Sequence, residues 1–280
     1  MPLLFHCGRF VLDATHPLIM AIVNLTDDSF SGDGWRGNAA AAIAHARRQI
    51  DAGADILDLG AESSRPGAAA VSAQQEIDRL LPVIEGLRDC GIPLSIDTAK
   101  PETMRAVLAA GVDMINDITA LQAPEALPLL AASRAGVCLM HMQGSPATMQ
   151  RQPTYRDVVG EVAAFLTARV EAAVAAGIAA ERIVVDPGFG FGKTFQHNLA
   201  LLRRLGELTV ELAALGRPLL VGLSRKSVLG QIVGKAENDR VYAGLAAHLW
   251  AIQRGARVLR VHDVEATRDV LTVFRTLEDD

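Results

Sequence analysis

The sequence lacks several features that mark whole classes of protein. Its formal charge is −5, and its 27 basic residues are spread along the chain, which argues against a nucleic-acid-binding surface. It has no apolar run of roughly 18 residues, as a membrane-spanning helix needs. The start, Met1 to Arg9, is too short and too broken by polar residues for a signal peptide. These absences predict a cytoplasmic protein that binds neither nucleic acid nor a membrane.

Cysteines and familiar catalytic motifs are also scarce. Cys7, Cys90 and Cys138 are odd in number and have no metal-ligand spacing, so we expect free thiols in a reducing compartment. There is no G-x-S-x-G elbow, no H-x-x-x-H pair and no C-x-x-C pair, and no cysteine follows a predicted strand as a nucleophile would. The chemistry that remains is substrate positioning and leaving-group stabilisation, without a covalent enzyme intermediate.

One stretch, IVVDPGFGFGK at 183–193, organises the chain. Its branched apolar residues predict a buried strand that ends at Asp186, where a carboxylate can meet a ligand. The glycines that follow let the backbone come close to a flat or anionic group. The spacing is neither a Walker A loop nor a dinucleotide fingerprint. The alternative is a glycine-rich turn between strand and helix that ends in a solvated lysine, Lys193.

The rest of the chain repeats this unit of short strand, polar loop and amphipathic helix. Eight such units in about 250 residues predict a (β/α)₈ TIM barrel, although a doubly wound open sheet would use the same units. We expect one domain, 1–280, with a hairpin within 1–17 that closes the base of the barrel. The predicted strands are Leu18–Val23, Ile56–Leu59, Leu94–Ile96, Met114–Ile115, Val137–Met140, Ile183–Val185, Leu219–Val221 and Val258–Val261.

Local signals mark helix starts and irregular loops. Ser72 with Gln75 resembles a capping box, Pro101 suits a first helical turn, and Asn238-Asp239 can cap the helix through Ile252. The segments 26–38 and 143–153 are the least regular. Because both follow strands, they are candidate lids on the catalytic face of a barrel.

Polar residues close every predicted strand, and in a barrel they converge on one mouth. Each alone could be a cap or a loop hydrogen bond. The set is Asn24, Glu62 to Arg65, Asp97, Asn116, His141, Asp186, Ser224 to Ser227, Arg260 and His262.

These polar residues divide by chemistry. Asp97, Asn116, Asp186 and Lys226 come from apolar strands and would lie deep, where they suit a flat heterocycle rich in N–H and C=O groups. The cationic Arg65, Arg260 and His262 would lie nearer the rim and suit phosphates. Asn24 offers one neutral oxygen, which is adequate for a Mg²⁺ held mainly by substrate phosphates.

The ordered motifs resemble those of the dihydropteroate synthase family, from about Leu18 to Leu277. The resemblance implies a TIM barrel, usually a homodimer, that joins 6-hydroxymethyl-7,8-dihydropterin diphosphate to p-aminobenzoate and releases diphosphate. This is an alkyl transfer in folate biosynthesis, which sulfonamides inhibit. The motifs are IVNLTDDSF (22–30), GAESSRPGA (60–68), SIDTAKP (95–101), INDI (115–118), LMHMQGSPATMQ (139–150), DPGFGFGK (186–193), VGLSRKS (221–227) and RVHDV (260–264).

The resemblance also implies roles for individual residues. The aromatic amine is neutral at working pH and needs no general base. The implied catalytic residues are Asn24, Lys226, Arg260 and His262. The pterin would be held by Asp97, Asn116, Met140, Asp186, Gly222 and Lys226, and Mg²⁺ by Asn24. The diphosphate would contact Ser64, Arg65, Arg260 and His262, and the aminobenzoate would contact Phe30, Pro66, Phe191 and Ser227.

The sequence departs from the family pattern in its first loop. Asp27 stands where proline is usual, the acidic residue of the 32–34 stretch is shifted by one, and Ser64 replaces a more usual threonine. Asp27 leaves open a non-catalytic pterin-binding paralogue. The pterin carboxylates are also shared by a barrel that transfers methyl from methyltetrahydrofolate to a corrinoid protein. Lys226, Arg260 and His262 argue against this second alternative. A dimer would use the late helices, 239–254 and 264–277.

Overall fold

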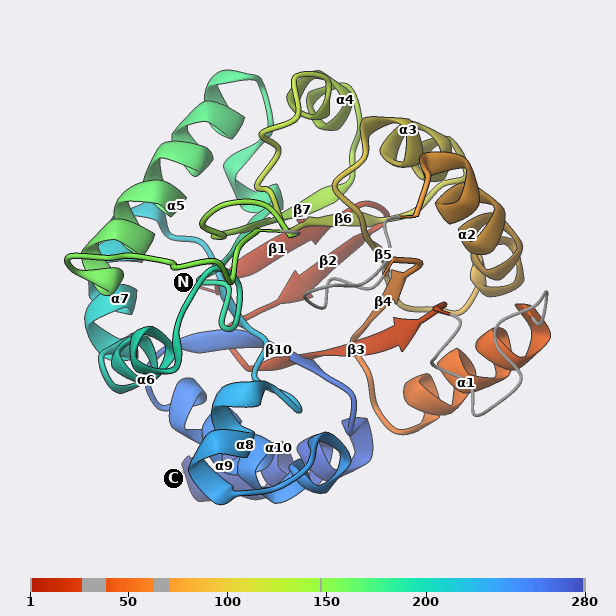
Figure 1. The fold of residues 1–280 in the computed structure, drawn as a ribbon. Helices are drawn as coiled ribbons and strands as arrows, with labels where there is room; N and C mark the ends of the chain where they lie inside the picture. The colour runs from red at the N-terminus through yellow and green to blue at the C-terminus, as the bar shows by residue number, and fades with distance from the viewer. Residues whose placement is uncertain (1, 27–38, 63–70, 147, 279–280) are drawn as a thin grey trace.

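The chain forms a closed barrel of eight parallel strands, in the order β10-β3-β4-β5-β6-β7-β8-β9, ringed by helices (Figure 1). The computed structural model describes residues 2–26, 39–62, 71–146 and 148–278. The TIM-barrel prediction is confirmed, and the open sheet is excluded because β10 pairs with β3. The barrel strands are β3 (Leu18–Asn24), β4 (Ile56–Gly60), β5 (Leu94–Asp97), β6 (Met114–Asp117), β7 (Gly136–Met140), β8 (Ile183–Asp186), β9 (Leu219–Val221) and β10 (Ala256–Val261).

The helices of the described chain surround the barrel (Figure 1). Their apolar faces pack on the outer side chains of the strands and form the main hydrophobic core. They are α1 (Ala39–Asp51), α2 (Ala73–Leu87), α3 (Pro101–Ala109), α4 (Ala126–Ala131), α5 (Val158–Ala175), α6 (Phe195–Arg203), α7 (Leu205–Leu212), α8 (Ser227–Val233), α9 (Val241–Ile252) and α10 (Val264–Glu278), with 3₁₀ turns η1 (Ala180–Arg182), η2 (Ala213–Leu215) and η3 (Glu237–Asp239).

An antiparallel hairpin precedes the barrel, formed by β1 (Leu4–Cys7) and β2 (Phe10–Asp13). Phe5 and Cys7 of the hairpin are fully buried, in a second core that includes Met20, Met114 and other inward-facing strand residues. The hairpin therefore covers side chains inside the barrel at the end where the strands begin.

The register of the strands brings polar residues to one level at the opposite end. Asn24 pairs with Gly60, Gly60 with Asp97, and Asp97 with Asn116, across β3, β4, β5 and β6. Farther around the barrel, Asp186 on β8 pairs with Met140 on β7. In a parallel barrel, this end is where the loops that follow the strands gather. The register therefore positions the site.

The local signals in the sequence are mostly, but not all, realised. Ser72 and Gln75 form the expected capping box at α2, and Pro101 begins α3. The expectation that Asn238-Asp239 caps the late helix is wrong. Residues 237–239 form the 3₁₀ turn η3, and α9 begins at Val241 after Arg240, which makes no side-chain cap. In the described part of the chain, no helix is both long and apolar enough to span a membrane.

Candidate active site

An arginine joins two carboxylates at the mouth of the barrel. Arg260 of β10 donates from Nε to Asp58 Oδ2 over 2.6 Å and from Nη2 to Asp97 Oδ2 over 2.8 Å. Burial opposes the charge of Arg260, but the two carboxylates outweigh this effect and raise its pKa. Arg260 was expected near the rim. It instead lines the deep pocket, with its side chain 20% exposed.

Asp58 is a site residue that the sequence reasoning missed. It lies on β4, two residues before the strand ends, and is fully buried. Its carboxylate accepts hydrogen bonds from Ser95 Oγ (2.7 Å), Asn116 Nδ2 (3.0 Å) and Arg260 Nε. After this bond, Asn116 keeps its side-chain carbonyl oxygen and its second amide N–H for another partner. The available signal was a carboxylate inside an otherwise apolar strand, since a buried charge needs partners.

The expected pterin residues do come together. A small cavity lies among them. Its lining consists of Asp97, Asn116, Ile118, Met140, Asp186, Gly188, Phe189, Phe191, Gly222, Lys226 and Arg260. Acceptors, donors and aromatic faces thus surround one small space, as edge-on recognition of a flat heterocycle requires.

The charges in this cavity are finely balanced. Burial raises the pKa of Asp97 to about 7, against the lowering effect of Arg260. Burial also raises the pKa of Asp186, which accepts a hydrogen bond from the Gly188 N–H at 2.7 Å. Burial, followed by repulsion from Arg260, lowers the pKa of Lys226 to about 8. Perturbed groups that share a cleft are typical of functional sites.

Lys226 lies above an aromatic ring. Its Nζ is 4.2 Å from the centroid of Phe191, a cation–π contact. In the described part of the chain, no hydrogen-bond acceptor is recorded for this ammonium, so its N–H donors remain available in the cavity. Met140, Met142 and Met149 pack with Phe191 in a small apolar cluster beside it. Met149 belongs to the 143–153 segment, which therefore lies against the loop after β8.

The loop after β8 is shaped by a buried lysine. Lys193 is 2% exposed, so the alternative of a solvated lysine is wrong. Its Nζ donates to the carbonyls of Gly188 (2.9 Å) and Phe191 (3.1 Å) and lies 2.9 Å from His141 Nδ1. Burial lowers the pKa of Lys193 to about 7, and burial with the Lys193 ammonium lowers that of His141 to about 3.

Glycine is required within this loop. Gly188 has φ +66°, and a Cβ there would overlap the carbonyl oxygen of His141. The loop after β8 thus packs directly on the backbone after β7, where His141 N–H donates to Asp186 O at 2.9 Å.

The loop after β9 carries the remaining expected residues. Ser224 Oγ lies 3.0 Å from His262 Nδ1, and the backbone N–H of His262 donates to the same oxygen over 3.2 Å. Burial, then the charges of Arg225 and Arg260, lower the pKa of His262 to about 3. The expected rim cation is therefore a neutral imidazole in the ligand-free protein.

Arg225 and Ser227 flank the lysine of this loop. Arg225 has φ +60°, a left-handed conformation that is strained for arginine, and its guanidinium pairs with Asp263 at 2.7 Å. Ser227 is exposed and begins α8, whose N-cap, Lys226, makes no side-chain cap. The first N–H groups of α8 are therefore open to another acceptor.

Asn24 is the last residue of β3 and lies beside Gly60, which has no side chain. A Cβ at Gly60 would lie 3.9 Å from both Asn24 Oδ1 and Asp97 Oδ2, so the two oxygens border the same space. Within the described residues, no cluster of three His, Cys, Asp or Glu side chains could hold a metal. A single neutral oxygen such as Asn24 Oδ1 fits a Mg²⁺ ion whose other ligands are phosphate and water oxygens.

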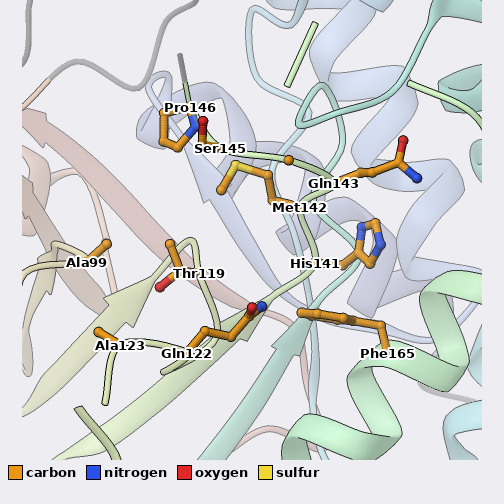
Figure 2. Close-up of a pocket in the computed structure, with 11 residues that line it drawn as sticks. Ala99, Thr119, Gln122, Ala123, His141, Met142, Gln143, Ser145, Pro146 and Phe165 are labelled. Atoms are coloured by element: carbon orange, nitrogen blue, oxygen red, sulfur yellow. The ribbon is translucent and has the colours of Figure 1, made fainter. Parts of the chain in front are cut away.

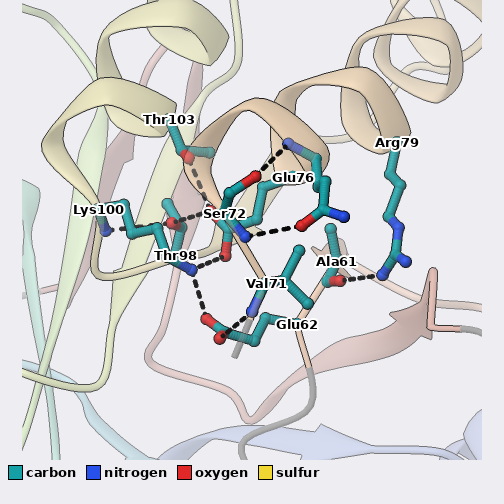
Figure 3. A network of polar contacts seen from close by, with 10 residues as sticks. Ala61, Glu62, Val71, Ser72, Glu76, Arg79, Thr98, Lys100 and Thr103 are labelled. Atoms are coloured by element: carbon teal, nitrogen blue, oxygen red, sulfur yellow. Dashed lines mark hydrogen bonds and ion pairs between the residues drawn. The ribbon is translucent and has the colours of Figure 1, made fainter. Parts of the chain in front are cut away.

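A polar network braces the loop after β4 (Figure 3). Lys100 Nζ bridges Glu62 Oε2 (2.5 Å) and Glu76 Oε1 (2.8 Å), and Glu76 is 1% exposed. Glu62 Oε1 also accepts from the N–H of Val71 at 3.0 Å. Glu62 and Val71, the described residues on either side of 63–70, are thereby joined directly. Ser64, Arg65 and Pro66 of that segment, and Phe30, lie outside the described residues.

A larger hollow of about 580 Å³ lies outside this site (Figure 2). It is lined by amide, alcohol and apolar side chains, with His141 and Phe165 on one side. Among the described residues, no carboxylate, lysine or arginine lines it. Of these two hollows, the smaller cavity is the one that described charged residues line, and it can offer partners to a polar, anionic ligand.

Comparisons with known proteins agree with this geometry. Residues 20–262 match the family described as "Pterin binding enzyme". The dihydropteroate synthase of Neisseria meningitidis serogroup B is 50% identical over 279 residues, covering 98% of this chain and 97% of that protein.

Two solved structures are similarly close. Dihydropteroate synthase from Xanthomonas albilineans with 4-aminobenzoic acid has a TM-score of 0.92 and 46% identity, and covers 100% of both chains. The Yersinia pestis enzyme in a sulfonamide complex has a TM-score of 0.92 and 42% identity, and covers 99% of this chain and 100% of that chain.

The barrel, the carboxylate-lined cavity and the family match define a pterin-binding barrel enzyme. The identity over nearly the whole length then narrows the assignment. The chain belongs to the dihydropteroate synthase family and is a transferase.

Proposed function

We propose that the cavity binds 6-hydroxymethyl-7,8-dihydropterin diphosphate and that the enzyme joins its methylene carbon to the amine of p-aminobenzoate. The observation that carries this proposal is the convergence of Asp97, Asn116, Asp186 and Lys226 on one small cavity. Carboxylates accept from the N–H groups on the pterin edge, and the lysine donates to its C=O group. Met140, Gly222 and the ring of Phe191 complete the walls.

The diphosphate would leave toward the rim. Departure of an anion from the methylene carbon leaves a cation conjugated with the pterin, so the protein must stabilise the leaving group. Arg260 and His262 serve this purpose in the described part of the chain, and Ser64 and Arg65 are proposed partners outside it. Mg²⁺, when bound at Asn24, neutralises charge on the diphosphate.

The aminobenzoate would bind next to the pterin, against the ring of Phe191. Its amine carries a lone pair at neutral pH and attacks the methylene carbon without a general base, and the resulting ammonium then releases one proton to water. Its carboxylate would lie at Ser227, where the uncapped N–H groups of α8 and the helix dipole favour an anion. Phe30 and Pro66 are proposed to complete this pocket. Sulfonamides, one of which is bound in the Y. pestis complex, would compete there.

We also propose a homodimer in the cytoplasm. The late helices carry exposed apolar side chains that a partner subunit would cover: Tyr242, Trp250, Val273 and Leu277. All three cysteines are free thiols, as in reducing compartments.

One experiment tests the reaction. The purified protein is incubated with pterin diphosphate, p-aminobenzoate and Mg²⁺, and dihydropteroate and free diphosphate are quantified. Equal amounts of both products support the proposal. Pterin binding without either product would indicate a non-catalytic paralogue instead.

A further inference from the structure

Ser224 and His262 contact each other twice at the mouth of the barrel. They follow the neighbouring strands β9 and β10, and the distances are 3.0 Å from Ser224 Oγ to His262 Nδ1 and 3.2 Å from the backbone nitrogen of His262 to Ser224 Oγ. Ser224 is 9% exposed, so little water reaches its hydroxyl. Nothing in the proposed reaction uses this serine directly.

The donor and acceptor count fixes the direction of the side-chain bond. A backbone N–H can only donate, so it occupies one lone pair of Ser224 Oγ. If Nδ1 also carried a proton, the hydroxyl would accept twice. Its own proton would then have no recorded acceptor among the described residues. A nearly buried donor without an acceptor is costly, whereas a hydroxyl that donates to a bare Nδ1 satisfies every group.

We propose that Ser224 is a positioning residue that holds His262 in the tautomer with the proton on Nε2. Burial and the cations Arg225, Arg260 and Lys226 lower the pKa of this imidazole and keep it neutral, and the nearby Asp263 acts in the opposite direction. With Nδ1 occupied by Ser224, Nε2–H is the ring donor left for a ligand, and no partner for it is recorded within the described chain.

The consequence rests on the proposed role of His262 at the diphosphate. In this tautomer the ring presents an N–H to an anionic oxygen. In the other tautomer it would present a lone pair, which repels the anion. Ser224 therefore makes His262 a neutral hydrogen-bond donor, and the charge of the leaving group is balanced by Arg260 and other cations. Ser224 acts on the reaction only through the imidazole.

Nuclear magnetic resonance tests the tautomer directly. The protein is labelled with ¹⁵N at its seven histidines, and long-range ¹H–¹⁵N correlations distinguish protonated from bare ring nitrogens. Loss of one signal set in His262→Gln assigns the residue. We expect a bare Nδ1 and a protonated Nε2 in the wild type, unchanged between about pH 5 and 8 because the ring stays neutral. A protonated Nδ1 in the wild type overturns the proposal without any need for a serine variant.

Variants then test the role of the serine. Ser224→Ala should give a mixture of tautomers and lower kcat for the synthesis by about threefold to tenfold. The KM for p-aminobenzoate should stay within about twofold. Ser224→Thr keeps the hydroxyl and should restore both the tautomer and most of kcat. Ser133→Ala removes a serine hydroxyl near the end of α4 and should change neither. An unaltered tautomer in folded Ser224→Ala refutes the assignment.

The two proposals fail in different ways. If no dihydropteroate forms but the resonance pattern is as expected, the proposed reaction is wrong and the tautomer assignment stands. If the reaction proceeds and Ser224→Ala has normal kcat with mixed tautomers, the tautomer does not matter at the leaving group and the positioning role is refuted.

Discussion

Asp58 and Arg260 are 202 positions apart in the sequence, yet their carboxylate and guanidinium lie 2.6 Å apart in the barrel. The pair links β4 to β10. These two strands lie on either side of β3, and the pairing of β3 with β10 closes the barrel. The same guanidinium reaches Asp97. The most buried carboxylate of the site is therefore tied to a residue that we place at the leaving group.

Asp58→Asn should be strongly destabilising. It removes the charge that compensates Arg260 and disturbs the bonds from Ser95 and Asn116. Breaking a buried ion pair costs about 3–5 kcal/mol. Chemical denaturation measures this loss. Glu125→Gln breaks the exposed Arg105–Glu125 pair and serves as the control, with an expected cost below about 1 kcal/mol. Equal costs for the two variants would contradict the structural role given to Asp58.

Lys193→Met should destabilise the protein and weaken pterin binding together. The variant leaves the carbonyls of Gly188 and Phe191 without their buried donor, so the loop that carries Phe191 loses its fixed shape. We expect a loss of roughly 2–4 kcal/mol in unfolding free energy. Lys235→Met, at an exposed lysine, should have almost no effect. Calorimetry with a pterin ligand and denaturant titration measure the two losses.

The cost of Lys193→Met should also grow with pH. The pKa of Lys193 is about 7 in the folded protein, below the ordinary lysine value of 10.5. Between these pH values the unfolded chain therefore binds more protons than the folded one. The unfolding free energy of the wild type therefore rises with pH above about pH 7. Below pH 7 the lysine is charged in both states, and the full cost of burying its charge applies. The difference in unfolding free energy between wild type and variant should widen from pH 7 to pH 9. A constant difference would show that Lys193 is not buried with a depressed pKa.

Lys100→Met should impair diphosphate use more than pterin recognition. It leaves the buried Glu76 unpaired and releases Glu62, whose other oxygen holds Val71 at the end of the 63–70 segment (Figure 3). Because Arg65 is a proposed diphosphate partner, KM for the pterin diphosphate should rise by about tenfold. Affinity for a pterin without diphosphate should change by less than about twofold. Glu85→Gln, in an exposed pair on α2, is the control.

The sequence predicted which side chains lie together where the strand ends alone decide this. Asp97, Asn116, Asp186 and Met140 lie together because parallel strands in register end at one level. Asp58 was missed because its partners come from β5, β6 and β10, and no local spacing reveals a contact over 202 positions. For Lys193, the sequence left open the alternative of a solvated side chain. Only a backbone folded around it, with left-handed glycines, turns its ammonium inward.

Lys226 should make pterin affinity depend on pH above neutrality. Its pKa of about 8 in the free protein means that the ammonium is lost as the pH rises through 8, and with it the donor offered to the pterin C=O group. The pterin affinity should therefore be constant below that pH and weaken above it, by at most about tenfold per pH unit. Lys226→Arg keeps its charge and should bind with little change from pH 7 to pH 9, whereas Lys226→Gln should bind weakly throughout. Titration calorimetry with one pterin ligand across the three proteins cancels the ionisation of the ligand itself. If wild type and Lys226→Arg lose affinity in parallel, the pH dependence belongs to another group, and the assignment of Lys226 as the pterin donor is withdrawn.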